Sequence, residues 1–406
     1  MTFNGSKMNY QESKKGNNTL VLWLASWYPG HTHTTNGDFI ERHAQAVSEF
    51  QKLIVLFIEK DPLLPYGETK EIKTEDGNLI VYKVYYNKPR WGSYLGKLFS
   101  LYRFSRLQKK YYKKIAAEHG KPELVHVHVA MKAGILAIEL KRKLGIPYAL
   151  TEHWTGYYKE SSPNIYTVQP AIKYLIRRII EKADVFLPVT HHLGKTISES
   201  FVPVNYQVIP NVVNTKFFYY KPKNQGRFRF IHPSYLNYQK NPEGMIRAAV
   251  KLAESGYDFE LFLLGNDDKE LIRLVETTGL LNKNILVHPE VPYQEVARQM
   301  QESSALVLFS RFENLPCVLL EALCCGLPVI STDVGGIPEA VTHKNGILVK
   351  SEDTDGLVSA MRNMIDNYSK FDRVGIANDA VRKFSYEVVA EKYMQVYKDL
   401  MAKSPK

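Results

Sequence analysis

The chain of 406 residues has a hydrophobic content of 45% and a charged content of 23%, which are values of a folded globular protein and exclude a largely disordered one. This length predicts two or three domains with full cores, and no apolar run approaches the ~20 residues that a transmembrane helix needs. The net charge of +11 falls entirely in the first half, because residues 1–200 contain 29 Lys and Arg against 18 Asp and Glu, whereas residues 201–406 contain 24 of each.

The first segments predict one unit of strand, loop and helix. Residues 1–18 are polar, without periodicity and without a visible secretory signal, so we expect a disordered tail on a cytoplasmic protein. Thr19–Ala25 is a continuous apolar run, typical of a buried parallel strand, and Phe39–Val47 has a helical period. Gly37, in the loop between them, is either an ordinary turn glycine or a point where the backbone approaches a ligand closely.

Two further strands are predicted at Lys52–Glu59 and Leu79–Tyr85. We expect loops between and after them, including the aromatic and basic segment Tyr86–Trp91, and we expect that segment to face a cleft.

Leu98–Glu118 predicts a long helix with an apolar face and a basic stripe. The apolar positions are Leu101, Phe104, Tyr111 and Ile115, and the stripe beside them is Arg103, Arg106, Lys110 and Lys113. One interpretation is a helix that lies on an anionic membrane surface, and the other is a core-packed helix with a solvated charged face. No nucleic-acid-binding motif accompanies the charge, so we expect no nucleic acid partner.

Histidines mark the next two strands. In the strand Leu124–Val129, His126 and His128 lie on one face, which suits either a metal or a structural role, and no further ligand cluster is apparent. A helix at Ala133–Leu144 leads to a strand at Tyr148–Thr151. His153 follows that strand, and residues past the carboxyl end of a parallel strand face the ligand crevice in open α/β sheets.

The strand and helix pattern then restarts, which predicts a second domain. A strand at Ala183–Thr190 and a strand and turn at Gln207–Asn214 come before a linker at Tyr219–Arg227. The strands predicted after the linker are Phe228–His232, Phe259–Leu264, Asn284–Val287, Ala305–Phe309 and Val329–Ile330. We therefore predict an α/β protein with two Rossmann-like, doubly wound domains.

Lys240 lies between the strand at Phe228 and a helix predicted at Asn241–Glu254. A lysine beside a helix start offers a compact positive charge together with backbone amides, which suits a phosphate group.

The stretch Arg311–Ala340 contains two acids eight positions apart, Glu313 and Glu321. Pro316 suits the first turn of a helix, which places Glu313 on the loop before that helix and Glu321 inside it. A turn at Asp333–Pro338 is predicted to open another helix at Glu339, so that two helix starts form a phosphate cradle. The three cysteines, Cys317, Cys324 and Cys325, lack metal-ligand spacing and are predicted to be small buried residues in a reducing compartment.

This stretch resembles the Glu-x7-Glu signature of the large retaining family four of nucleotide-sugar glycosyltransferases. The resemblance rests on the two acids, on Asn314-Leu315-Pro316, on Ala322–Ile330 and on Gly335–Glu339. It implies the GT-B fold, in which two Rossmann-like domains face one cleft. The implied divisions are an acceptor domain at 19–218, a linker at 219–227, a donor domain at 228–385 and a helix at 386–406 that crosses back to the first domain.

The resemblance also implies roles for single residues. Catalytic roles fall on Glu313 beside the sugar, on Lys240 at the diphosphate and on His153, which touches the sugar from the other domain. Glu321 is implied to hold the ribose. The other implied donor-binding residues are Asn314, Leu315, Pro316, Gly37, Asn211, Gly335 and Gly336. Tyr235 departs from the pattern, because the family usually has an arginine five residues before the lysine.

The implied reaction is retaining, metal-independent transfer of a hexose from a UDP- or GDP-sugar, with no cofactor and no Asp-x-Asp element expected to hold a metal. The implied acceptor is lipid-linked or a polysaccharide, as in cell-envelope or exopolysaccharide synthesis at the inner membrane face. Two alternatives are a nucleotide-sugar epimerase of the same fold and a non-catalytic glycan- or membrane-binding protein.

Overall fold

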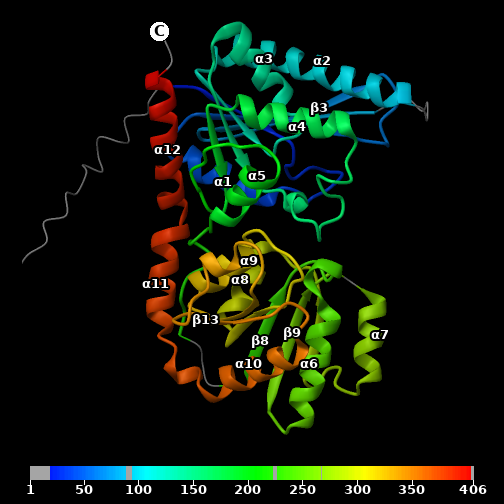
Figure 1. Ribbon diagram of the computed structural model, residues 1–406, viewed down its shortest axis with the longest axis vertical. Coiled ribbons are helices and arrows are strands. Elements are labelled where there is room, and N and C mark those ends of the chain that lie inside the picture. The colour runs from blue at the N-terminus through cyan, green and yellow to red at the C-terminus, as the bar shows by residue number, and fades with distance from the viewer. Residues whose placement is uncertain (1–18, 88–93, 223–225, 267, 404–406) are drawn as a thin grey trace, which may run out of the picture.

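A computed structural model describes residues 19–87, 94–222, 226–266 and 268–403, with only the backbone of residues 94–98. The chain forms two α/β halves, stacked along the long axis of the molecule in Figure 1, each built on its own sheet. The predicted tail and most of the segment Tyr86–Trp91 lie outside the described residues, as does part of the predicted linker.

The first half contains a seven-stranded sheet in the order β3-β4-β2-β1-β5-β6-β7, parallel except for β3. Its strands are β1 (Val21–Ala25), β2 (Leu53–Lys60), β3 (Thr69–Asp76), β4 (Leu79–Tyr86), β5 (Leu124–His128), β6 (Tyr148–Glu152) and β7 (Val185–Pro188). Its helices are α1 (Asp38–Ser48), α2 (Tyr94–His119), α3 (Gly134–Leu144), α4 (Pro170–Lys182) and α5 (His191–Ser200).

The second half contains a six-stranded parallel sheet in the order β10-β9-β8-β11-β12-β13. Its strands are β8 (Phe228–Pro233), β9 (Phe259–Gly265), β10 (Ile285–Pro289), β11 (Ala305–Leu308), β12 (Val329–Thr332) and β13 (Gly346–Val349). Its helices are α6 (Pro242–Glu254), α7 (Lys269–Thr277), α8 (Tyr293–Gln301), α9 (Cys317–Cys324), α10 (Thr354–Asp366) and α11 (Arg373–Phe384), and α12 (Tyr386–Lys403) follows. The predicted fold class, two doubly wound α/β domains, is confirmed.

The central strands are continuous apolar runs because helices cover both faces of each sheet. β1 is buried along its whole length and lies in register with β2 and β5, with Val21 opposite both Leu53 and Leu124. β3 is the exception and was missed: it reads TKEIKTED, is mostly exposed, and pairs antiparallel with β4 at the sheet edge. An edge strand with solvent on its faces carries no apolar run, so the sequence predicted a loop there.

Two other predicted elements differ from the structure. Gln207–Asn214 forms no named strand. It still runs beside the edge strand β7, because Tyr206 bridges Phe186 in parallel and the N–H groups of Gln207 and Ile209 donate to carbonyls of β7. The helix predicted to open at Glu339 is a single 3-10 turn, η3 (Ile337–Glu339). The chain turns there towards β13, which leaves no length for a full helix.

The final helix crosses back to the first half, as the resemblance implied. α11 lies beside the second half and α12 continues beside the first (Figure 1). Tyr397 of α12 bonds to Trp23 of β1 and to His126 of β5, and Tyr386 donates to Gln45 of α1. One continuous apolar core therefore includes the first sheet, α9 and α12.

Candidate active site

The carboxyl ends of both sheets face each other across a cavity of about 840 Å³. The lining residues from the first half include Gly37, Arg42, His153 and Asn211, and those from the second include Lys240, Glu313, Asn314, Leu315 and Pro316. Glu321 lines an adjoining cavity of about 420 Å³, and Gly335 lines another of about 580 Å³ that also reaches Glu313. The structure thus gathers most of the predicted site residues around one cavity.

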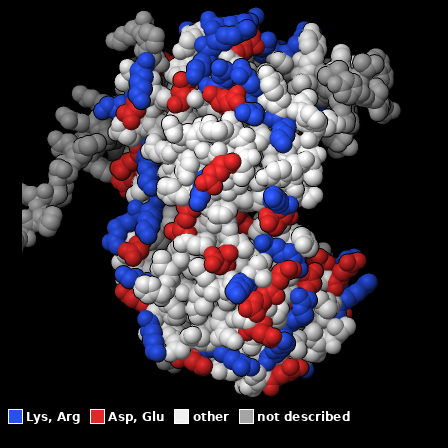
Figure 2. Space-filling model, viewed as in Figure 1, with Lys and Arg blue, Asp and Glu red and all other residues white. Residues whose placement is uncertain are grey.

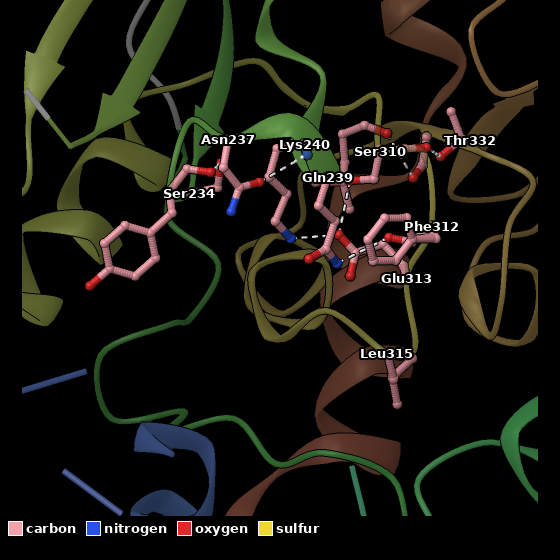
Figure 3. A network of polar contacts seen from close by, with 12 residues as sticks. Ser234, Asn237, Gln239, Lys240, Ser310, Phe312, Glu313, Leu315 and Thr332 are labelled. Carbon is pink, nitrogen blue, oxygen red and sulfur yellow. Dashed lines mark hydrogen bonds and ion pairs between the residues drawn. The ribbon is translucent and has the colours of Figure 1, made fainter. Parts of the chain in front are cut away.

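The partly buried Lys240 and the buried Glu313 form an ion pair at this cavity (Figure 3). Lys240 ends the short 3-10 turn after β8, where the side chain of Asn237 accepts from the backbone N–H of Lys240. The Lys240 Nζ atom lies 2.5 Å from Glu313 Oε1, and Ser310 Oγ donates to the same oxygen at 2.9 Å. The Glu313 side chain is only 5% exposed, so its charge needs these partners.

Glu313 lies on the loop before α9, and Glu321 lies inside that helix, as predicted. Pro316 is the N-cap of α9, and Cys317 and Val318 in the first turn of this helix line the cavity. The backbone N–H groups of a first helical turn lack partners within the helix and favour anions. The buried carboxylate of Glu321 accepts a hydrogen bond from Tyr293 OH at 2.8 Å. Burial raises the pKa of Glu321, and the charge of Arg42 opposes that rise. Of the three cysteines, Cys324 and Cys325 are buried, whereas Cys317 is half-buried at the cavity wall.

Gly335 and Gly336 hold the loop that carries Glu313. Gly335 has a φ of +55°, and a Cβ there would overlap the carbonyl oxygen of Glu313. The N–H of Gly336 donates to the carbonyl of Asn314 at 2.9 Å. The observed role of the pair is close backbone packing, and a contact with the donor stays a prediction.

The position of Gly37 suits both interpretations of its sequence, as a turn glycine and as a point where the backbone approaches a ligand. It caps α1 with a φ of 79°, and a Cβ there would lie 2.6 Å from the backbone of Trp27 and Tyr28. A side chain would therefore be strained and crowded. Gly37 also lines the large cavity, so a ligand role stays a prediction.

Asparagines join the two halves beside the cavity. Asn314 Nδ2 donates to the carbonyl of His153 at 3.2 Å, and its Oδ1 accepts from Thr190 at 3.0 Å. Asn211 Nδ2 donates to the carbonyl of Leu315 at 2.6 Å. Close by, the carboxylate of Glu339 accepts the first backbone N–H groups of α5, from His191 and His192. These bonds fix the loop of Glu313 against the first half.

His153 lines the large cavity from the first half. Burial lowers the pKa of His153 well below its usual value, and the side chain of Asn211 opposes that shift. Its backbone is held by Glu152, whose carboxylate accepts N–H bonds from Ala130, His153 and Trp154 and a hydroxyl bond from Tyr157. Glu152 was left without a role by the sequence, and the structure makes it the anchor of this strand end.

His126 and His128 have structural surroundings. Their rings lie 4.3 Å apart beside Trp23, and His126 bonds to Tyr397 and Thr151. No group of three or more His, Cys, Asp or Glu in the described ranges is arranged to hold a metal ion. The Asp-x-Asp sequence at Asp353–Asp355 starts α10, where Asp353 caps the helix and Asp355 pairs with Lys251.

Arg42 and Tyr293 were not assigned by the sequence and lie at the centre of the site. Arg42, on α1, pairs with Asp38 at 2.9 Å and stacks over the ring of Tyr293 on α8. The only signal in the sequence was an arginine inside a predicted helix, four residues after an acid.

The basic helix α2 is packed into the first half. Phe104, Tyr111 and Ile115 are buried as predicted, whereas Leu101 is exposed. Arg103 donates to the carbonyls of Asn87 and Glu68, so it is not a free surface charge. Figure 2 shows basic side chains gathered at the end of the first half where α2 and α3 lie. Within the part of the chain that the structure describes, no helix has the length and apolar character needed to cross a membrane.

Comparisons with known proteins agree with this architecture. Residues 66–217 match the family model Glycosyltransferase Family 4, and residues 214–380 match Glycosyl transferases group 1. N-acetyl-alpha-D-glucosaminyl L-malate synthase from Bacillus anthracis is 27% identical over 304 residues, which cover 70% of this chain and 77% of that protein. A putative teichuronic acid biosynthesis glycosyltransferase from Bacillus subtilis is 25% identical over 365 residues, covering 84% and 88%.

Solved structures share the fold at low identity. Sucrose-phosphate synthase from Thermosynechococcus elongatus matches with a TM-score of 0.76 at 18% identity, covering 95% of this chain and 100% of that one. Anabaena HepE in complex with UDP and glucose matches with a TM-score of 0.65 at 16% identity, covering 94% and 100%.

Proposed function

The chain belongs to the glycosyltransferase family that these two models describe, and on this premise we propose that it transfers a hexose from a UDP- or GDP-sugar to a glycan or lipid-linked acceptor. The observation that carries the proposal is the ion pair of Lys240 and Glu313 beside the first turn of α9, with Glu321 buried eight residues further on. A positive charge for a diphosphate and carboxylates for sugar hydroxyls thus lie beside two adjoining cavities.

The donor is proposed to lie across the two adjoining cavities. The nucleoside occupies the cavity of about 420 Å³, where Glu321 accepts hydrogen bonds from the ribose hydroxyls. The hexose occupies the larger cavity, between Glu313 and His153. Lys240 and the amides at the start of α9 stabilise the diphosphate. The Anabaena structure with UDP and glucose supports a UDP-sugar as the first donor to test.

The transfer is proposed to retain the anomeric configuration by front-face displacement. The bond from the anomeric carbon to the phosphate oxygen breaks, the acceptor oxygen bonds to the same carbon, and the leaving phosphate takes the acceptor's proton. Glu313 is held by Lys240 and Ser310, which suits a carboxylate that positions the sugar better than one that attacks it. The positive charges of Lys240 and of the helix start take the role that a metal ion would otherwise fill, so we predict transfer without added metal.

The relatives support an acceptor in the cell envelope, since one is named for teichuronic acid biosynthesis. A membrane-bound acceptor would give α2 a role, because Arg106, Lys110 and Lys113 are exposed on it. Replacing these three with glutamine is expected to reduce co-sedimentation with vesicles that contain anionic lipid. Unchanged co-sedimentation would assign α2 to the core alone.

The proposal is tested by measuring nucleotide binding and transfer in EDTA. UDP, GDP and ADP are compared by thermal unfolding, because a ligand at ~100 times its dissociation constant stabilises by about 2.7 kcal/mol. We expect one nucleotide to raise the melting temperature, its hexose conjugate to be consumed only with an acceptor, and the product to keep the donor's anomeric configuration by NMR. Glu321→Gln should lose the shift, and Glu199→Gln, an exposed control on α5, should keep it.

No shift with any nucleotide, in protein that unfolds cooperatively, would overturn the proposal. Release of free sugar without an acceptor would indicate the epimerase alternative instead.

A further inference from the structure

The two cavities that receive the donor share one wall, and this wall contains a single cation among the described residues. The shared residues come from three segments: Thr34, Thr35 and Arg42 of the first half, residues 233–235 at the end of β8, and Cys317 and Val318 at the start of α9. Lys240 lines the larger cavity but does not line the smaller one. A ligand that extends from one cavity to the other must pass this wall.

The guanidinium of Arg42 is buried and incompletely satisfied at this place. The Arg42 side chain is 10% exposed, and its Nη1 donates to Asp38 at 2.9 Å. Its Nε is buried without a hydrogen-bond partner among the described residues. A guanidinium has five N–H donors and retains its charge, and the bond to Asp38 engages only Nη1, so the part of the Arg42 side chain that reaches the cavity can also bind an anionic ligand.

Arg42 also spans the two halves of the molecule. It is part of α1 in the first half, and its guanidinium stacks over Tyr293 of α8 in the second half, with 5.0 Å between the guanidinium carbon and the ring centroid. Tyr293 in turn donates to Glu321. An anion bound by Arg42 would therefore contact both halves at once.

We propose that Arg42 binds the diphosphate of the donor from the first half of the chain, opposite the start of α9 and Lys240. The inference rests on the proposed function, because it takes the ligand to be a nucleoside diphosphate that spans both cavities. Its consequence is that donor phosphate draws the two halves together, so that the hexose is enclosed when it reacts.

Calorimetry tests this assignment. It compares how variants of Arg42 bind a nucleoside, its monophosphate and its diphosphate, with the base that the wild-type protein prefers. We expect Arg42→Gln to weaken binding of the diphosphate about 10- to 100-fold, since a hydrogen bond to a charged group is lost, and to change binding of the nucleoside by less than about threefold. Arg42→Lys should retain part of the affinity for the diphosphate. Arg177→Gln, an exposed arginine on α4 with the same charge change, should bind like the wild type.

The outcomes separate this inference from the proposed function. Equal diphosphate binding by wild type and Arg42→Gln would overturn the inference and leave the proposed function standing. Equal losses for nucleoside and diphosphate would also overturn it, by showing that Arg42 only shapes the nucleoside cavity through Tyr293. If the wild type binds no nucleotide, both fail. If Arg42→Gln does not fold, the comparison is decided by Arg42→Lys, for which a loss confined to phosphate-bearing ligands is expected.

Discussion

Glu313 depends on its neighbours for both charge and position. Its carboxylate accepts from Lys240 and Ser310, and its backbone is packed against Gly335, which admits no side chain. An amide at this position would be a weaker acceptor and would leave the Lys240 ammonium buried without a counterion.

Glu313→Gln is therefore expected to lower turnover at saturating donor at least about tenfold. Nucleotide affinity should stay within about threefold, because the nucleoside is proposed to bind beside Glu321 rather than Glu313. Nucleotide release in the presence of acceptor gives the turnover, and calorimetry gives the affinity. Near-normal turnover would remove Glu313 from the proposed mechanism.

Glu152 makes a second residue-scale prediction. It is fully buried and accepts four hydrogen bonds, three from backbone N–H groups at the ends of β5 and β6. Glu152→Gln replaces one acceptor oxygen with an NH₂ group that faces donors, so we expect a loss of about 2–4 kcal/mol in the free energy of unfolding. Urea denaturation measures this loss. Glu123→Gln, at an exposed position in the same half, should change it by less than about 0.5 kcal/mol, and an equal loss in both variants would contradict the anchor role.

At the scale of elements, α12 is attached to the first sheet by a small number of buried polar contacts. Tyr397 OH bonds to His126 Nδ1 at 2.6 Å and to Trp23 Nε1 at 3.0 Å, whereas Tyr393 OH has a single long contact of 3.4 Å with Thr151. The two tyrosines are one turn apart on the same helix and equally buried, so they form a matched pair.

Tyr397→Phe should cost about 1–3 kcal/mol in the free energy of unfolding, because it leaves two buried groups unsatisfied. Tyr393→Phe should cost less than about 1 kcal/mol. Urea denaturation followed by circular dichroism compares them. A larger cost for Tyr393→Phe would mean that ring packing, rather than the hydroxyl bonds, holds α12 in place.

The elements also show what could be predicted from the sequence. The buried parallel strands and the loop-to-helix placement of Glu313 and Glu321 followed from apolar runs and a proline at the helix start, both local signals. β3 was missed because an exposed edge strand has no apolar pattern. The helix expected after Gly336 ended as one 3-10 turn, since its length depends on where β13 lies and not on its own residues.

The residues of the candidate site likewise differ in how far they could be predicted from the sequence. Lys240, Glu313 and Glu321 were predicted because the residues around them along the chain resemble the family's signature, and spacing alone carried little weight. Arg42 meets Tyr293 only after the two halves fold against each other, a separation of about 250 residues along the chain that no local pattern encodes. The anchoring of His153 by Glu152 likewise depends on the pairing of β5 with β6.

At the scale of the whole molecule, both halves bury histidines, four near the cavity and one in the second core. His43, His126, His128 and His153 lie among α1, β5, β6 and α12, with His43 5.6 Å from both His153 and Tyr393 between ring centroids. His232 lies in the second sheet, where it bonds to the carbonyl of Val307. Burial lowers the pKa of each, to about 3 for His43 and about 4 for His232.

These shifts set the sign of the pH dependence. In the unfolded chain each histidine binds a proton below its ordinary pKa of about 6.5, whereas the folded chain keeps these five neutral. The stability of the fold is therefore fully present above about pH 6.5 and is lost progressively as the pH falls towards the folded values. Each histidine contributes up to about 1.4 kcal/mol per pH unit over that interval. Glu152 and Glu321 act in the opposite direction, because burial raises their pKa values. Each adds stability as the pH falls from its folded pKa to its ordinary pKa, and has no further effect below that value.

We therefore expect the free energy of unfolding to fall steeply between pH 6.5 and 5, as measured by urea denaturation at a series of pH values. His43→Gln should flatten the profile by up to about 1.4 kcal/mol per pH unit in this range, since the unfolded chain then binds one proton fewer while the folded chain is unchanged. His343→Gln, at an exposed position in the second half, serves as the control and should leave the slope unchanged. A flat profile from pH 7.5 to 5 in the wild-type protein would mean that the buried histidines take up protons without unfolding, and the two halves would then have to open around the cavity to admit water.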